Sequence, residues 1–242
     1  MGTLAESKMV EVLTNIEVNI DEKEVLRLQG YRHHISPRPA VRKLVVEEIA
    51  EGCRLIRPQA IWGEVRVREM RAGAIVLDSG VVLGTEREVG AWQGAGYLVV
   101  ALCTIGPVLE RRVAELFSEQ NFAAAVMLDS VGSVAAEGVA DHVNWLLCHR
   151  AMASGLKTGP RLSPGYGKWQ LSAQRALFSI LDGGEIGLRL NEQCMMIPRK
   201  SVSFCVGVGA EVVEERAAER CRYCGMKGCH YRRDSSVPGS PQ

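Results

Sequence analysis

The apolar run Tyr97 to Cys103, with the sequence YLVVALC, constrains the fold of this chain more than any other feature. Its residues do not alternate between apolar and polar, so the run predicts a strand that is buried on both faces of its sheet. Far along the chain, Ser201 to Val208 does alternate, with Val, Phe and Val on one side and Ser, Cys and Gly on the other. That pattern predicts a second strand.

The remaining helices and strands follow one another in an irregular order. Helices are expected at Asp21 to Gly30, at Pro37 to Ala50 with Gly52 as the stop, after a cap at Thr104, at Ala123 to Cys148, and at Leu171 to Asp182. Further strands are expected at Ile61 to Met70, at Ala74 to Leu77 and Val81 to Leu83 as a hairpin, and at Ile186 to Met196 with a break at Asn191. Because no strict strand–helix–strand rhythm appears, we predict a mixed α/β (α+β) fold whose sheet is largely antiparallel and packed with helices.

The composition argues against several functional classes. The 242 residues are 47% hydrophobic, which is enough to bury a core in one large domain without disulfides. A net charge of +1 lacks the basic surplus that is typical of nucleic-acid-binding proteins. The chain shows neither a run of about 18 apolar residues nor a secretory signal. We therefore expect a cytoplasmic protein with reduced cysteines.

The stretch PRLSPGYGKWQ, from Pro160 to Gln170, is too rich in proline and glycine to be a regular helix or a central strand. Arg161 carries a planar fork of donors suited to a carboxylate or a phosphate. The glycines allow a close approach of the backbone to a ligand. Tyr166 and Trp169 add flat faces with polar edges. The stretch predicts either a preformed lip for a small anionic molecule or a rigid connection whose arginine pairs with a surface acid.

Arg161 to Tyr166, with the sequence RLSPGY, resembles the R-x-x-P-G-Y signature of the activation domain of cobalamin-dependent methionine synthase, whose loop binds S-adenosylmethionine. Segments around it resemble the same domain in the same order: Asp129 to Glu137, Gln174 to Leu181, Ile186 to Glu192, Met195 to Pro198 and Lys200 to Ser203. The strong similarity covers about Gly159 to Cys205, and a weaker one reaches back to about Tyr97.

This resemblance implies roles for four residues of the loop. Arg161 would bind the carboxylate of S-adenosylmethionine. Backbone groups of Ser163 and Gly165 would hold the polar atoms of the same ligand. Tyr166 would stand near the corrin face, where the methyl group arrives.

The resemblance also implies supporting residues outside the loop. Ser201 and Ser203 would line the facing strand, and Glu137 on the long helix would face the corrin or support the site. The acidic residue that the family uses on this helix corresponds to Ser133, with Asp129 and Glu137 one turn away on either side. The later tyrosine of the family's sheet has no counterpart here.

The function implied by the resemblance is the reductive reactivation of a cobalamin or other corrinoid. One electron and the methyl group of S-adenosylmethionine would restore the methylated cofactor, so the protein would position reactants and need no general base. The cobalamin would be carried by a partner, either a corrinoid protein or the methionine synthase core, and a flavodoxin- or ferredoxin-type donor would supply the electron. The chain would then be a stand-alone subunit with these parts: an N-terminal α/β portion (1–95), an S-adenosylmethionine-binding core (96–210), a helix with a cysteine cluster (211–233) and a disordered tail (234–242).

The cysteine cluster has the spacing C-x₂-C-x₄-C, formed by Cys221, Cys224 and Cys229. Thiolates at this spacing can converge on one metal, and both zinc and an iron–sulfur cluster fit it. Cys194, Cys205 or His230 would provide the fourth ligand. Reduced thiols on a flexible tail are the alternative.

Two other functional classes stay open at this point. In the first, the chain is a metal-bearing binding or regulatory module that holds a small molecule without methyl transfer. In the second, it is a structural partner subunit that binds no small ligand.

Overall fold

The computed structural model describes residues 9–14, 16–31 and 36–213. Its main sheet is formed by β1 (Val10–Thr14), β2 (Gln59–Arg71), β3 (Ala74–Leu77), β4 (Val82–Leu83), β5 (Tyr97–Thr104), β6 (Lys157–Thr158) and β9 (Ser201–Gly209). The strand order is β4-β3-β2-β5-β9-β6, with β1 also paired to β2. All of these pairings are antiparallel, so the predicted fold class is confirmed.

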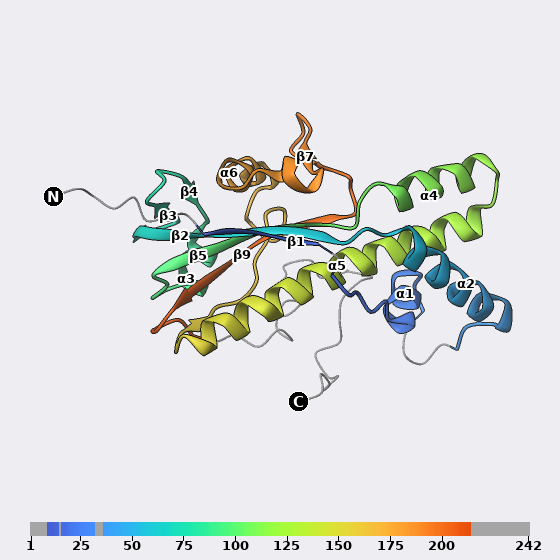
Figure 1. The fold of residues 1–242 in the computed structure, drawn as a ribbon, viewed down its shortest axis with the longest axis horizontal. Coiled ribbons are helices and arrows are strands. Elements are labelled where there is room, and N and C mark those ends of the chain that lie inside the picture. The colour runs from blue at the N-terminus through green and yellow to red at the C-terminus, as the bar shows by residue number, and fades with distance from the viewer. Residues whose placement is uncertain (1–8, 15, 32–35, 214–242) are drawn as a thin grey trace.

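Helices cover the sheet on both sides. They are α1 (Glu22–Leu28), α2 (Pro39–Leu55), α3 (Glu86–Ala91), α4 (Val108–Ser118), α5 (Phe122–Ala153) and α6 (Gln174–Ile180). Figure 1 shows the long α5 crossing one face of the sheet, with α1 and α2 beside it, and α6 on the opposite face. A separate hairpin of β7 (Arg189–Leu190) and β8 (Met196–Ile197) lies on the side of α6.

β5 is buried on both faces, as its continuous apolar sequence predicts. Val99, Ala101 and Cys103 belong to the core beneath α5. Leu98, Val100 and Leu102 belong to a second core beneath α6. β9 lies beside β5 in register and divides its side chains in the same way, so these two strands are the centre of the molecule.

The long helix α5 is a core element. By length and composition it could cross a membrane, but more than half of its apolar stretch is buried inside the protein. Glycines let neighbours approach closely: a Cβ on Gly138 would lie 2.7 Å from Val18 Cγ1, and one on Gly132 would lie 2.6 Å from Leu109 Cδ2. The apolar surface of α5 is therefore used for packing.

The predicted stop at Gly52 is wrong, because α2 continues to Leu55. Gly52 is buried where α2 crosses α5, and a Cβ at this position would lie only 2.4 Å from Val131 Cγ1. This glycine serves close packing between two helices and does not end one of them.

The predicted helix cap at Thr104 is also wrong. Thr104 is the last residue of β5, and α4 begins four residues later, after Pro107. The Thr104 hydroxyl instead accepts a hydrogen bond from Gly106 N at 3.1 Å and one from Ser201 Oγ at 2.9 Å. It stabilises the turn by which the chain leaves the sheet.

The segment Ile186 to Met196 is not the broken strand that the sequence predicts. Gly183–Ile186 forms a 3-10 turn, and the hairpin of β7 and β8 follows. Asn191 lies in the turn of this hairpin, where its Oδ1 accepts a hydrogen bond from Met195 N at 2.8 Å. The expected helix before it begins as a 3-10 turn at Leu171–Ala173 and continues as α6.

Candidate functional site

The loop that carries the R-x-x-P-G-Y motif is attached to β9 and to α3. Leu162 exchanges two backbone hydrogen bonds with Cys205 of β9, at 3.0 and 2.8 Å. Trp92, at the C-terminal end of α3, donates from Nε1 to the carbonyl of Pro160 at 2.9 Å. The start of the loop therefore continues the edge of the sheet beyond β6.

The tip of the loop is a tight turn. Gly165 adopts a φ of +90°, and its N–H donates to the carbonyl of Trp169 at 2.8 Å. Trp169 is buried and meets Trp92 edge-on, with ring centroids 6.0 Å apart. Tyr166 points away from the core and is 62% exposed. The turn thus holds an exposed aromatic ring on a rigid base.

Arg161 lies on the α5 side of the sheet. Its guanidinium carbon is 5.3 Å from the centroid of the Phe204 ring on β9. Its Nη2 donates to Glu137 Oε2 at 2.6 Å and lies 3.3 Å from Asp141 Oδ1. Its Nη1 is buried and has no hydrogen-bond partner among the described residues. Pairing with acids is what the rigid-connection alternative predicts, but it leaves one half of the donor fork unused.

Burial and charge define the electrostatics around Arg161. Its side chain is only 4% exposed, whereas those of Glu137 and Asp141 are 38% and 51% exposed, so the site opens to solvent on the side of the two acids. Cys103 lies nearby in the core, where burial raises the pKa of its thiol to about 12, although the positive charge of Arg161 lowers it. Cys103 is therefore a neutral thiol with no role as a nucleophile.

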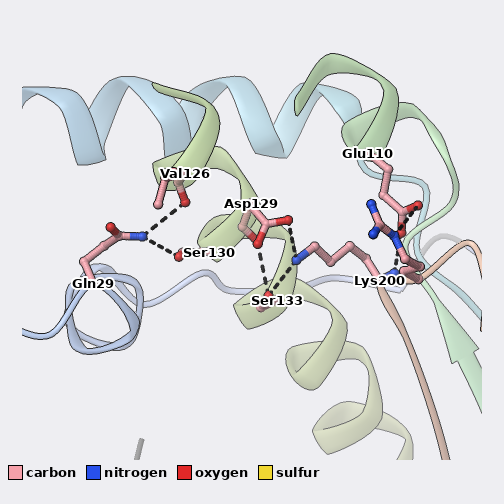
Figure 2. Close-up of polar contacts among 8 residues, drawn as sticks. Gln29, Glu110, Val126, Asp129, Ser130, Ser133 and Lys200 are labelled. Atoms are coloured by element: carbon pink, nitrogen blue, oxygen red, sulfur yellow. Dashed lines mark hydrogen bonds and ion pairs between the residues drawn. The ribbon is translucent and has the colours of Figure 1, made fainter. Parts of the chain in front are cut away.

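A line of polar residues on α5 connects this site to the start of β9. The line consists of four residues that are spaced four positions apart, so they lie on one flank of the helix: Asp129, Ser133, Glu137 and Asp141. Lys200 Nζ lies 2.8 Å from Asp129 Oδ1 and 2.8 Å from Ser133 Oγ (Figure 2). The backbone N–H of Lys200 donates to Glu110 Oε1 of α4 at 2.5 Å. Lys200 therefore contacts one end of this line of residues, and Arg161 contacts the other end.

Asp141 and Lys200 are site residues that the sequence analysis did not single out. The spacing of four from Glu137 to Asp141 was the available signal for the first. Lys200 directly precedes the Ser-Val-Ser motif, but nothing in the sequence indicates that it reaches Ser133. Ser133, which the resemblance aligns with an acidic residue of the family, accepts a hydrogen bond from Lys200 Nζ.

The structure brings together some predicted residues and separates others. Arg161 and Glu137 are in direct contact. Ser203 lies on the side of β9 that faces the α6 core, opposite to the side of Arg161, because side chains alternate along a strand. Ser201 bonds to Thr104 and to the Pro198 carbonyl. A role for the two serines in lining the ligand site stays a prediction.

The predicted metal ligands Cys221, Cys224 and Cys229, like His230, lie outside the described residues. Of the proposed fourth ligands, Cys194 and Cys205 are buried, and burial raises the pKa of the Cys205 thiol. Within residues 9–14, 16–31 and 36–213, no group of three or more His, Cys, Asp or Glu side chains could hold a metal ion.

Comparison with known proteins places the fold. No family model matches the sequence, and no curated protein matches it. Among solved structures, the MetH reactivation domain bound to AdoHcy matches over 88% of this chain and 84% of its own, with a TM-score of 0.59 and 10% sequence identity. The described part of the chain therefore has the fold of the methionine synthase reactivation domain, the domain that its loop motif resembles.

Proposed function

We propose that this chain binds S-adenosylmethionine at Arg161 and passes its methyl group to a corrinoid carried by a partner protein. The state of Arg161 carries the proposal, because its Nη1 is buried without an acceptor in the described part of the chain. An unpaired buried donor on a charged group is costly, and a ligand carboxylate would satisfy it. A domain of the same fold was solved with AdoHcy, which shares its amino-acid end with S-adenosylmethionine.

Charge complementarity supports the same ligand. Arg161, Glu137 and Asp141 together carry a net charge of −1, and they lie within one cluster of ion pairs. S-adenosylmethionine has one carboxylate, one ammonium and one sulfonium group, so its net charge is +1. The carboxylate fits Arg161, and the cationic groups fit the two exposed acids.

The chain's share of the chemistry is positioning. A corrinoid on the partner, once reduced by one electron from the donor, would supply the acceptor for the methyl cation of the sulfonium, and S-adenosylhomocysteine would remain at Arg161. The rigid turn at Gly165 would hold the ligand, and the exposed ring of Tyr166 would stand at the rim where a flat corrin can approach. A corrinoid protein or methionine synthase core would be the partner, and a flavodoxin- or ferredoxin-type protein in the cytoplasm would donate the electron.

Cys221, Cys224 and Cys229 are proposed as a separate metal site, holding zinc or an iron–sulfur cluster. Their spacing in the sequence supports this part of the proposal. Metal analysis and an absorption spectrum of anaerobically purified protein distinguish the two. Stoichiometric zinc without visible absorption would remove an electron-relay role.

Isothermal titration of the purified chain with S-adenosylmethionine tests the central proposal. We expect saturable binding that weakens about thirtyfold or more in Arg161→Ala, since truncating one partner of a buried charged contact costs about 2 kcal/mol or more. Arg112→Ala is the matched control, because Arg112 also pairs with two acids, Glu115 and Glu119, but on the surface of α4. Thermal unfolding of both variants would check that they remain folded.

The outcomes separate the functional classes. Binding that survives in Arg161→Ala would contradict the assignment of the site. Binding without methylation of reduced cobalamin in solution or on a corrinoid protein would favour a regulatory module. No binding of any adenosyl ligand would favour a structural subunit.

A further inference from the structure

A cavity lies on the flank of α5 that is away from Arg161. It has a volume of about 320 Å³ and is formed by the C-terminal end of α5 together with β2, β5, β9 and Met9, which precedes β1. Its apolar lining includes Val99, Leu147 and Val208, and its polar lining includes Trp62, Glu64 and Arg150. A cavity of this size matches small-ligand sites in proteins.

Trp62 lines this cavity and carries a buried donor that nothing in the described part of the chain satisfies. The residue is fully buried, and its Nε1 has no hydrogen-bond partner there. The indole N–H can only donate, so it needs an acceptor. Trp92, which is also fully buried, shows the usual solution, since its Nε1 donates to the Pro160 carbonyl at 2.9 Å.

Glu64 contributes a carboxylate to the cavity, and the nearby cation Arg150 is already paired with Glu11. Arg150 donates to both oxygens of Glu11, at 2.6 and 2.9 Å, while its guanidinium carbon lies 5.0 Å from the centroid of the Trp62 ring. Among the described residues the Glu64 carboxylate forms no ion pair within 4.0 Å. Burial raises the pKa of Glu64, and the charge of Arg150 only partly offsets that effect.

We propose that this cavity binds a small zwitterion with an apolar side chain, of the α-amino acid class. The ligand carboxylate would accept from Trp62 Nε1 beside Arg150, and its ammonium would pair with Glu64. Its side chain would pack on Val99, Leu147 and Val208. The site uses no residue of the Arg161 cluster, so it is independent of the proposed S-adenosylmethionine site.

Isothermal titration with L-leucine and L-methionine tests the inference. Isovalerate and 3-methylbutylamine serve as probes that carry only one of the two charges. We expect one equivalent of each amino acid to bind, and the single-charge probes to bind at least tenfold more weakly. Trp62→Phe and Glu64→Gln should each weaken amino-acid binding about tenfold or more, because each removes one hydrogen bond to a charged group.

Trp145→Phe is the matched control, because Trp145 is 56% exposed on the outer face of α5 and should leave binding unchanged. If Trp62→Phe does not fold, Ser154→Leu provides a second test, since Ser154 is an exposed residue of the cavity lining. Its larger side chain should block binding.

Three results of the titrations with amino acids and single-charge probes would overturn the inference: no binding of either amino acid at millimolar concentration, equal binding of the amine alone, or unchanged binding in the cavity variants. Displacement of L-leucine by S-adenosylmethionine would instead assign the cavity to the adenosyl site and would also overturn it. Because Arg161→Ala leaves this cavity intact, failure here and failure of the proposed function are distinguishable.

Discussion

Arg150 and Arg161 are two arginines that approach the same row of the sheet from opposite flanks of α5. One guanidinium lies over Trp62 and the other over Phe204, and both rings belong to residues paired in register with Ala101. Arg150 forms an ion pair with Glu11, and Arg161 forms one with Glu137. At each place one buried donor, Trp62 Nε1 or Arg161 Nη1, finds no partner within residues 9–14, 16–31 and 36–213, and these donors mark the two sites proposed for ligands.

Glu64→Gln is expected to change how stability depends on pH. Burial raises the pKa of Glu64 in the folded state, so the folded state holds the proton more tightly than the unfolded state does. The free energy of unfolding therefore falls as pH rises from the unfolded pKa through the raised folded one. Relative to wild type, Glu64→Gln should be more stable at pH 7 than at pH 3, as measured by chemical denaturation.

Glu69→Gln is the control for this change, since Glu69 lies on the same strand and is exposed. A Glu64→Gln variant whose stability relative to wild type is the same at pH 3 and pH 7 would contradict the burial of this carboxylate.

The crossing of α2 and α5 depends on Gly52, and a matched pair of glycine substitutions tests it. An alanine usually stabilises a helix interior by about 1 kcal/mol relative to glycine. At Gly52 the added Cβ would lie 2.4 Å from Val131 Cγ1, and overpacking costs about 1–3 kcal/mol. We expect Gly52→Ala to lower the free energy of unfolding by about 1 kcal/mol.

Gly90→Ala should have the opposite effect, because Gly90 is in α3 and no atom lies within 4 Å of a Cβ built there. We expect it to raise the free energy of unfolding by about 0.5 kcal/mol or more. Urea denaturation measures both variants. If Gly52→Ala were stabilising, the close approach of the two helices would be refuted.

Strands with a continuous hydrophobic pattern were predictable from the sequence, but the roles of single residues that were expected to end or cap a helix were not. The apolar run of β5 and the alternation of β9 determine which side chains face each core, whatever the rest of the chain does. Gly52 and Thr104 have the residue types of a helix stop and a helix cap, but their roles depend on distant partners, Val131 and Ser201. The ligand site that the loop motif predicts at Arg161 stays a prediction, and the contact of Arg161 with Asp141 could be found only in the folded chain.

At the scale of the whole molecule, the part of the chain that the structure describes has two cores that share the strands β5 and β9. One core lies beneath α5 and the other beneath α6, and alternate residues of β5 belong to each. The guanidinium of Arg161 lies on the α5 side, but Leu162 and Trp169 of the same loop pack in the α6 core. The position of the proposed site therefore depends on both layers.

This sharing predicts that the two cores unfold together. Leu128 on α5 and Leu177 on α6 are both fully buried, one in each core, so replacing either by alanine should cost about 2–5 kcal/mol. Native-state hydrogen exchange of the β5 amides is the measurement. If β5 opens only when the whole domain unfolds, Leu128→Ala and Leu177→Ala should each lower its protection by the full loss of stability measured by denaturation. If Leu177→Ala left the hydrogen-exchange protection of the β5 amides unchanged, the α6 layer would unfold separately from β5. A ligand at Arg161 would then have to stabilise the α6 layer through Leu162 and Trp169, the two loop residues that pack in it.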